Sequence, residues 1–157
     1  MIEQMSAFFT LLMIYMLLNI GVILFWLLFF IFPHTKVCGL FVTSIIPTFI
    51  LASVYVYLLY IFFFAGYDFD KNFILYLSFY DLAELFENNE FLILFWTHFL
   101  AINLFCGSWI VRDSQRFYMS KILVFFPLII TYFIGPLGLF IYWVIRIFFA
   151  KRISLFD

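Results

Sequence analysis

The chain has 157 residues and a formal net charge of −1; 68% of its residues are hydrophobic and 11% are charged. Soluble domains carry about a quarter charged residues, and a water-soluble fold of this size could not hide so much apolar surface. The eight basic and nine acidic residues are nearly balanced, which excludes a polycation that would bind nucleic acid. The composition therefore predicts an integral membrane protein.

Four apolar stretches are each long enough to cross a bilayer, since a hydrocarbon core of ~30 Å needs about 20 helical residues. They cover residues 5–32, 37–64, 91–111 and 122–149. Helices are expected because unpaired backbone groups in lipid cost several kcal/mol each, and the alternation typical of a membrane barrel is absent. We predict an all-α fold, in which residues 1–157 form a single transmembrane domain built as a four-helix bundle.

The segment between the second and third stretches is acidic. Ser78 and Asp81 have the spacing of a capping box. Apolar residues follow at helical spacing, namely Phe79, Leu82, Ala83 and Phe86. The pattern predicts a short amphipathic helix in this loop, lying on the membrane or against the end of the bundle. We interpret its acidic face as solvated, with a cation site as the less common alternative.

We expect a multi-pass protein of a bacterial inner membrane or an organellar membrane. Trp26, Trp109 and Trp143 lie near the ends of the stretches, as interfacial anchors often do. In a four-span bundle the Lys and Arg residues divide four and four between the two sides, so the positive-inside rule leaves the orientation open.

The two cysteines, Cys38 and Cys106, form no C-x-x-C motif and have apolar neighbours. We interpret them as buried thiols that pack as small hydrophobes. His98 has no second histidine four residues away, so we expect no metal site, and we expect no cofactor. His98 is a candidate general base or ligand, although a histidine bonded to a neighbouring hydroxyl or carbonyl is the commoner case.

Polar side chains inside the stretches need a partner or a purpose in lipid. Asn19 and Asn103 are predicted to lie at similar depth, where a mutual hydrogen bond would join two helices; a functional role is the open alternative. Gly107 shares a face with Asn103 and would let a helix or a flat ligand come close.

The ends of the last two stretches carry further candidates. Asp113 stands between Arg112 and Arg116, which indicates either a hydrated anchor or a polar site in which an arginine holds the carboxylate. Pro136, within Gly135-Pro136-Leu137-Gly138, removes a backbone hydrogen bond and should kink the fourth helix. Tyr132, one turn earlier, is placed to satisfy a freed group or to contact a ligand.

Residues 96–116 resemble the signature of the abscisic-acid-deficient-four-like membrane proteins. That signature reads approximately W-x-H-x-L-A-x-D-L-F-x-G-x-W, followed by R-D-S-Q-R. A later G-P-x-G-L matches residues 135–139, and Phe32-Pro33 and Leu85-Phe86 also fit. The chain departs from the signature at Asn103, where the motif has Asp, and at Ser108, where Arg is common.

The resemblance implies a four-helix membrane protein with a carotenoid or isoprenoid context, since the plant member is required for neoxanthin formation from violaxanthin. The ligand would lie along the third and fourth helices, and His98 and Asp113 are the candidate acid–base groups. The candidate ligand-binding residues are Trp96, Asn103, Phe105, Gly107, Trp109, Arg112, Gln115, Arg116, Tyr132, Gly135 and Pro136.

Two functional hypotheses remain open from the sequence. The first is a membrane enzyme, or a component of one, that acts on or binds a carotenoid-like lipid. The alternative is a non-catalytic accessory or structural subunit that contacts other membrane subunits and membrane lipids. The replacement of the expected Asp by Asn103 favours the alternative, because an amide cannot accept a proton as a carboxylate does. A transporter ranks lower, since no spaced intramembrane charges mark an ion path.

Overall fold

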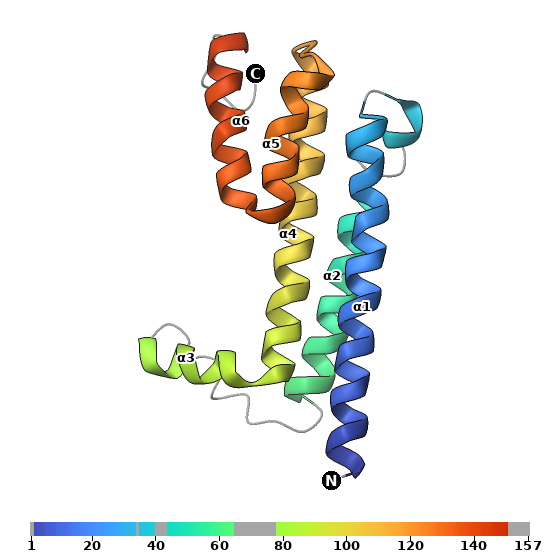
Figure 1. Ribbon diagram of the computed structural model, residues 1–157, viewed down its shortest axis with the longest axis vertical. Helices are drawn as coiled ribbons and strands as arrows, with labels where there is room; N and C mark the ends of the chain where they lie inside the picture. The colour runs from blue at the N-terminus through green and yellow to red at the C-terminus, as the bar shows by residue number, and fades with distance from the viewer. Residues whose placement is uncertain (1, 34, 40–43, 65–77, 151–157) are drawn as a thin grey trace. The chain divides into compact units, whose positions relative to one another are not determined.

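A computed structural model describes residues 2–33, 35–39, 44–64 and 78–150 of the chain. These residues are helical apart from short connections, and no strand occurs among them (Figure 1). The α-helices are α1 (Ile2–Ile31), α2 (Ile46–Leu59), α3 (Phe79–Glu87), α4 (Asn89–Arg116), α5 (Lys121–Phe133) and α6 (Gly135–Ala150), and a π-helical segment, η2 (Tyr60–Phe64), continues α2. The all-α prediction is confirmed for the described residues.

Two helical segments, Thr10–Ile31 and Asn89–Arg116, are long and apolar enough to cross a bilayer. The second, α4, extends the third predicted stretch at both ends and has 28 residues, ~42 Å at 1.5 Å per residue. The Asn88 side chain caps it by accepting hydrogen bonds from the backbone N–H groups of Glu90 and Phe91. Glu90 in its first turn and Arg116 in its last suit the helix dipole.

The second predicted stretch does not form one helix from residue 37. Residues 36–39 make a separate helical turn, residues 40–43 lie outside the described part, and α2 begins at Ile46. Pro47 lies in the first turn of α2, where its missing N–H would have no intrahelical partner in any case. The start of the predicted second helix is therefore wrong by several residues.

The fourth predicted stretch forms two helices, so a single kinked helix over residues 122–149 is wrong. Ile134 alone separates α5 from α6, and α6 runs back beside α5 (Figure 1). A proline inside a continuous helix would collide with the carbonyl four residues earlier, whereas Pro136 fits as the second residue of a new helix. The proline begins a helix here instead of bending one.

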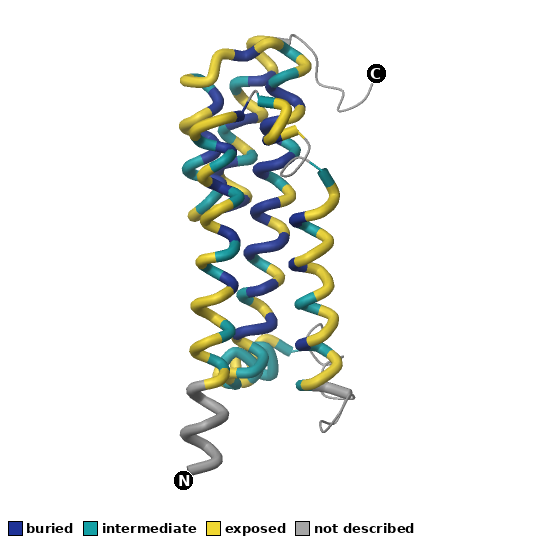
Figure 2. The backbone as a smooth tube through the Cα atoms, turned by 90° about the vertical axis from the view of Figure 1, so that its right-hand side faces the viewer, coloured by how far each residue is buried: buried dark blue, intermediate teal, exposed yellow. Residues whose placement is uncertain are grey.

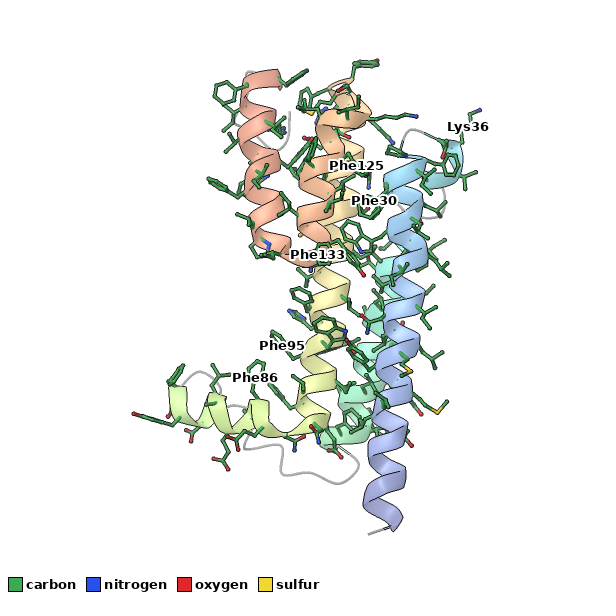
Figure 3. All side chains as sticks on the ribbon, viewed as in Figure 1. Phe30, Lys36, Phe86, Phe95, Phe125 and Phe133 are labelled. Carbon is green, nitrogen blue, oxygen red and sulfur yellow. The ribbon has the colours of Figure 1, made fainter. Side chains whose placement is uncertain are left out.

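The predicted amphipathic helix is present as α3, which lies crosswise to α4 (Figure 1). Ser78 is its N-cap residue, but the Ser78 side chain makes no capping hydrogen bond, so the predicted capping box is incomplete. None of its side chains is buried. Phe86 nevertheless packs edge-on against Phe91 and Phe95 of α4, with ring centroids 5.3 and 4.9 Å apart (Figure 3).

The chain forms two compact units, which are described separately: Met1–Gly21 with Ile50–Leu100, and Val22–Phe49 with Ala101–Asp157. Segments of α1 and α4 belong to each unit. The core of the first unit is made by Leu58, Ile93 and Leu94, with partly buried side chains of α1, α2, η2 and α4 packed around them. Buried and exposed positions both recur along α1, α2, α4, α5 and α6 (Figure 2).

The core of the second unit is centred on Trp26, which is 2% exposed. Its ring meets Tyr132 of α5 edge-on at 5.4 Å and also contacts Phe29, while Phe30 meets Phe125 at 5.7 Å (Figure 3). The prediction that Trp26 is an interfacial anchor is therefore wrong, because this indole is enclosed by helices of its own unit.

Helix α4 continues past residue 111, where the third predicted stretch ends, and closes in a Schellman motif. The Met119 N–H donates to the Ser114 carbonyl and the Tyr118 N–H to the Gln115 carbonyl. Tyr118 has a φ of 52°, a conformation that glycine usually supplies at this position. The turn leaves residues 117–120 between α4 and α5.

Both cysteines are free thiols, with Cys38 buried and Cys106 partly buried. Burial raises the pKa of the Cys38 thiol to about 11. The protonated thiol is a weak nucleophile at neutral pH, so the interpretation of Cys38 as a small hydrophobe holds.

Gly107 creates the space that Trp26 occupies. A Cβ at this position would lie 2.7 Å from Trp26 Cη2 and 3.2 Å from Phe29 Cε2, and both rings are buried. We expect Gly107→Ala to lower the free energy of unfolding by about 1–3 kcal/mol through overpacking. Thermal unfolding in mild detergent measures this.

Gly21→Ala is the matched control, since nothing lies within 4 Å of a Cβ added there and Gly21 is inside α1. The control should be neutral or stabilising, because alanine is favoured over glycine within a helix by roughly 0.5–1 kcal/mol. A Gly107→Ala variant as stable as the wild type would contradict this packing.

Candidate functional site

A buried polar cluster joins α4 to α6 in the second unit. The Asp113 carboxylate accepts two hydrogen bonds on Oδ2, one from the Tyr142 hydroxyl and one from Arg146 Nε, each 2.7 Å long. All three side chains are buried, and the Asp113–Arg146 contact is a salt bridge. The Arg146 guanidinium also lies over the Phe117 ring, 5.0 Å from its centroid. We name these three residues the buried triad.

The sequence places the triad through helical periodicity. Tyr142 and Arg146 are four residues apart on α6 and therefore share one face. Asp113 faces them from α4, and Trp109 on the preceding turn of α4 packs edge-on against Tyr142 at 5.6 Å. Charges in so apolar a place are tolerated only when they are paired and hydrogen-bonded, as they are here.

The sequence left two interpretations of Asp113 open, and the structure has the polar site in which an arginine holds the carboxylate. That arginine is Arg146 of α6. Arg112 and Arg116 are exposed on α4, and the Arg116 guanidinium lies 5.8 Å from the centroid of the Phe117 ring. Sequence reasoning missed Tyr142 and Arg146 because the contact spans some thirty residues. The available signal was Arg146 itself, a lone charge in the apolar run of α6.

The α5–α6 connection forms the hairpin tip, residues 134–138, which lies against Asn103 of α4. A Cβ at Gly135 would collide with Asn103 Oδ1, and one at Gly138 would collide with the backbone nitrogen of Thr131. Both glycines are therefore required by close approach. The Thr131 hydroxyl donates to the Pro127 carbonyl at 2.7 Å. Pro136 is exposed at the tip.

Asn103 is 3% exposed, and its Nδ2 has no hydrogen-bond partner among the described residues. Asn19 belongs to the first unit, where its Nδ2 donates to the Tyr15 carbonyl of its own helix at 2.7 Å, so the bond between the two asparagines stays a prediction. Asn103 lies at the N-terminus of α6, next to Gly135. This end of a helix favours negative charge, which matches the Asp of the resembled motif better than the Asn of this chain.

The remaining candidates on α4 divide between two faces of the second unit. Gly107 lies on the buried face, whereas Phe105, Trp109, Arg112 and Arg116 follow one another on the outer face at spacings of three or four residues. Gln115 Nε2 donates to the Pro33 carbonyl and so ties the end of α4 to the chain after α1. Tyr132 packs on Trp26.

Two candidates, His98 and Trp96, lie in the first unit. The His98 side chain is exposed, and its ring centroid is 5.9 Å from that of Tyr55. Trp96 stacks on Phe99 at 5.3 Å, and its Nε1 is buried without a hydrogen-bond partner among the described residues. His98 and Asp113 thus belong to different units. Within the described part of the chain, no three His, Cys, Asp or Glu side chains are grouped to hold a metal ion.

These observations define a class, a small all-α protein with two helices long enough to span a membrane and a helical hairpin bound to α4 by a buried ion pair. The chain belongs to the ABA DEFICIENT 4-like family, whose sequence profile matches residues 13–142. The predicted resemblance is confirmed, and the family is associated with neoxanthin and abscisic acid biosynthesis. No curated protein and no solved structure matches the chain.

Breaking the buried triad should destabilise the protein more than removing an exposed charge. Asp113→Asn leaves the Arg146 cation buried without its counter-charge, so we expect a loss of about 3–5 kcal/mol. Asp113→Asn combined with Arg146→Met should recover most of this loss, because no buried charge remains. Urea or thermal unfolding in detergent measures both.

Arg112→Met is the matched control for the triad, because Arg112 is exposed on the turn that carries Asp113. This control should change stability by no more than about 0.5 kcal/mol. A larger loss for Arg112→Met than for Asp113→Asn would contradict the assignment of the ion pair.

The two tip glycines should respond differently to a second substitution. Gly135→Ala collides only with the side chain of Asn103, so Asn103→Ala should restore stability. Gly138→Ala collides with the backbone of Thr131, so Thr131→Ala should not restore it. A double-mutant cycle of unfolding free energies tests both pairs. Rescue of Gly138→Ala by Thr131→Ala would show that the helices are farther apart than described.

Proposed function

We propose that this chain is a multi-pass membrane protein that binds a carotenoid or a related isoprenoid on the outer face of α4 and α6. Membership of a family associated with neoxanthin biosynthesis supports a polyene ligand. Two helices of sufficient length and apolarity support insertion in a bilayer. The observation that carries the proposal is an aromatic surface of the second unit that ends at a pair of arginines.

The aromatic strip consists of Phe105, Trp109 and Trp143. Phe105 is 55% exposed and Trp143 is 42% exposed, and the rings of Trp109 and Trp143 meet edge-on at 6.5 Å. The edge-on contact with the buried Tyr142 holds the Trp109 ring in its orientation. A rigid, flat, apolar chain gains most from such rings, because each offers a large polarizable surface with little conformational freedom to lose.

The outer face of α4 changes from aromatic to cationic toward its end. Phe105 and Arg112 are separated by seven residues, which is two turns and ~10 Å at 1.5 Å per residue. The Arg112 guanidinium provides hydrogen-bond donors for oxygen atoms on the end group of a ligand. This order of groups suits an elongated ligand with an apolar body and an oxygenated end.

The chemistry of the second unit favours binding over acid–base catalysis. Asp113 is the one carboxylate among the described residues of this unit, and it already accepts from Tyr142 and Arg146. Its carboxylate is one half of a buried ion pair. Asn103 replaces the acidic residue of the family motif, and His98 lies in the other unit. We therefore assign Asp113 a structural role and the aromatic strip the ligand.

The second candidate function, a subunit of a larger membrane complex, is favoured by α3. This helix has no buried residue, and its Phe79 and Tyr80 are 78% and 83% exposed. Native mass spectrometry from detergent distinguishes the two functions. A pigment-free protein that always carries a second polypeptide would favour the subunit role.

Polyene binding is tested by titrating the purified protein in mild detergent with β-carotene and zeaxanthin and recording the absorption spectra. We expect a saturable spectral shift with at least one pigment. Replacing Trp109 and Trp143 by alanine should weaken binding by ~10-fold or more, as loss of aromatic contacts does at interfaces. Arg112→Met should weaken zeaxanthin binding more than β-carotene binding, because only zeaxanthin carries oxygen.

Phe126→Ala is the matched control, because Phe126 is an exposed aromatic residue of α5 outside the aromatic strip. Its binding curve should equal that of the wild type. The proposal would be overturned if neither pigment gave a saturable spectral shift. It would also be overturned if Phe126→Ala lost as much binding affinity as the variant in which Trp109 and Trp143 are alanine.

A further inference from the structure

The α5–α6 hairpin is too short for either helix to cross a bilayer. α5 has 13 residues and α6 has 16, which gives ~20 and ~24 Å against a hydrocarbon thickness of ~30 Å. One residue, Ile134, connects them, and the close contact between Gly138 and Thr131 keeps the two helices side by side. Each helix therefore covers part of the membrane depth.

The hairpin lies along the C-terminal half of α4. Its tip contacts Asn103 through Gly135, and Arg146, further along α6, contacts Asp113. Asn103 and Asp113 are ten residues apart on α4, ~15 Å at 1.5 Å per residue. Asn103 is also close to the middle of the apolar stretch 91–111, so α4 places the tip near mid-depth.

We propose that α5 and α6 form a re-entrant hairpin, which enters the membrane from the side where α4 ends, turns at mid-depth and leaves by that same side. The proposal rests on the membrane insertion proposed above. Backbone groups at such depth need internal partners. The tip supplies two such bonds, since the Ile134 N–H donates to the Ile130 carbonyl and the Gly138 N–H to the Ile134 carbonyl.

The re-entrant hairpin changes the number of crossings from four to three. Two are α1 and α4. The third is α2 continued by η2, whose 14 and 5 residues together reach ~28 Å, more than either helix of the hairpin. The two ends of the chain then lie on opposite sides. The chain after α6 lies on the side of the α4–α5 turn and of the α1–α2 connection. The N-terminus and α3 lie on the other side.

This topology resolves the tie in the basic residues. Seven of the eight Lys and Arg residues collect on one side, namely Lys36, Arg112, Arg116, Lys121, Arg146, Lys151 and Arg152, and Lys71 alone is on the other. Leaving out Arg146, which is paired with Asp113, still gives six against one. A bias of this size fixes orientation by the positive-inside rule. The basic side therefore faces the cytoplasm and the anionic headgroups of that leaflet.

A group of acidic residues lies on the other side in this topology. Asp81, Glu84 and Glu87 of α3 and Glu90 of α4 belong to the side away from the basic residues. In this topology α3 lies at the outer surface of the membrane, with its acidic groups in water. The C-terminus lies inside and the N-terminus outside.

The sidedness of four positions tests the proposal in the full-length chain expressed in a bacterial inner membrane. The positions are an N-terminal tag, a C-terminal tag, Tyr80→Cys and Tyr118→Cys, with Cys38 and Cys106 replaced by alanine. Tyr80 and Tyr118 are 83% and 94% exposed, so these substitutions remove little packing. A membrane-impermeant maleimide and tag-specific antibodies are applied to spheroplasts and to inverted vesicles.

We expect Tyr118→Cys and the C-terminal tag to react only in inverted vesicles, and Tyr80→Cys and the N-terminal tag only in spheroplasts. A C-terminal tag on the side of Tyr80 would mean a full fourth crossing and would overturn the re-entrant hairpin. The reversed pattern, with Tyr118 outside, would overturn the orientation derived from charge. Release of the protein by alkaline carbonate without detergent would instead reject membrane insertion, and with it the proposed function.

A tip variant gives an independent measurement. Leu137→Cys, exposed at the hairpin tip, should react with the impermeant maleimide in neither preparation until detergent is added. Reaction in intact vesicles at the rate of Tyr118→Cys would place the tip at the surface and overturn the mid-depth position. Co-elution of each cysteine variant with the wild type on size-exclusion chromatography shows that it is folded.

Discussion

The contact between the backbones of α5 and α6 at Gly138 is the constraint on which the second unit depends. Any side chain at this position would meet the Thr131 nitrogen and Cα, neither of which a rotamer change can move. Because α5 and α6 approach each other so closely at this point, a single residue, Ile134, is enough to reverse the direction of the chain. Reversal in turn sets α6 beside α4, with Gly135 under Asn103 and the face of Tyr142 and Arg146 toward Asp113.

The buried triad adds register to this arrangement. Burying two charges is expensive, and a well-packed apolar pair would hold the helices as strongly. An apolar pair, however, would tolerate sliding by one turn, whereas Arg146 has a single carboxylate among the described residues of its unit to meet. Sliding α6 along α4 would separate Arg146 from Asp113 and leave both charges buried and unpaired. The ion pair therefore selects one alignment of the hairpin on α4.

Sequence patterns predicted the helices that periodicity and composition determine locally. The long apolar runs gave α1 and α4, and the spacing of Phe79, Leu82 and Phe86 gave α3. The break at Ile134 was not predictable in the same way, because a proline in an apolar run is equally compatible with a kink. What decides between them is the fit of Gly138 against Thr131, a contact between segments that fold back on each other.

The site was predicted in part for the same reason. The residues of the motif on α4 were found, since a family signature is read along the chain. Their partners were not, because Trp26, Tyr142 and Arg146 come from other helices and their sequence neighbours carry no sign of the contact. Arg112 and Arg116 are nearer to Asp113 in the sequence, but an ion pair at the exposed face would add little to the stability of the fold. Arg146 is buried, so its charge needs a carboxylate beside it.

Position 103 shows how geometry and charge can separate in a family motif. A carboxylate at the N-terminus of the 16-residue α6 would be stabilised by the helix dipole and could exchange a proton with a ligand. Asn103 has nearly the same shape, so it still fills the space that Gly135 leaves, but it carries no charge and leaves Nδ2 without a partner. The contact with Gly135 therefore depends on the shape of the side chain at position 103, and its charge is a separate property that this chain lacks. Asp113 is already bound by Tyr142 and Arg146, so within the described residues of the second unit neither position 103 nor position 113 offers an unbound carboxylate.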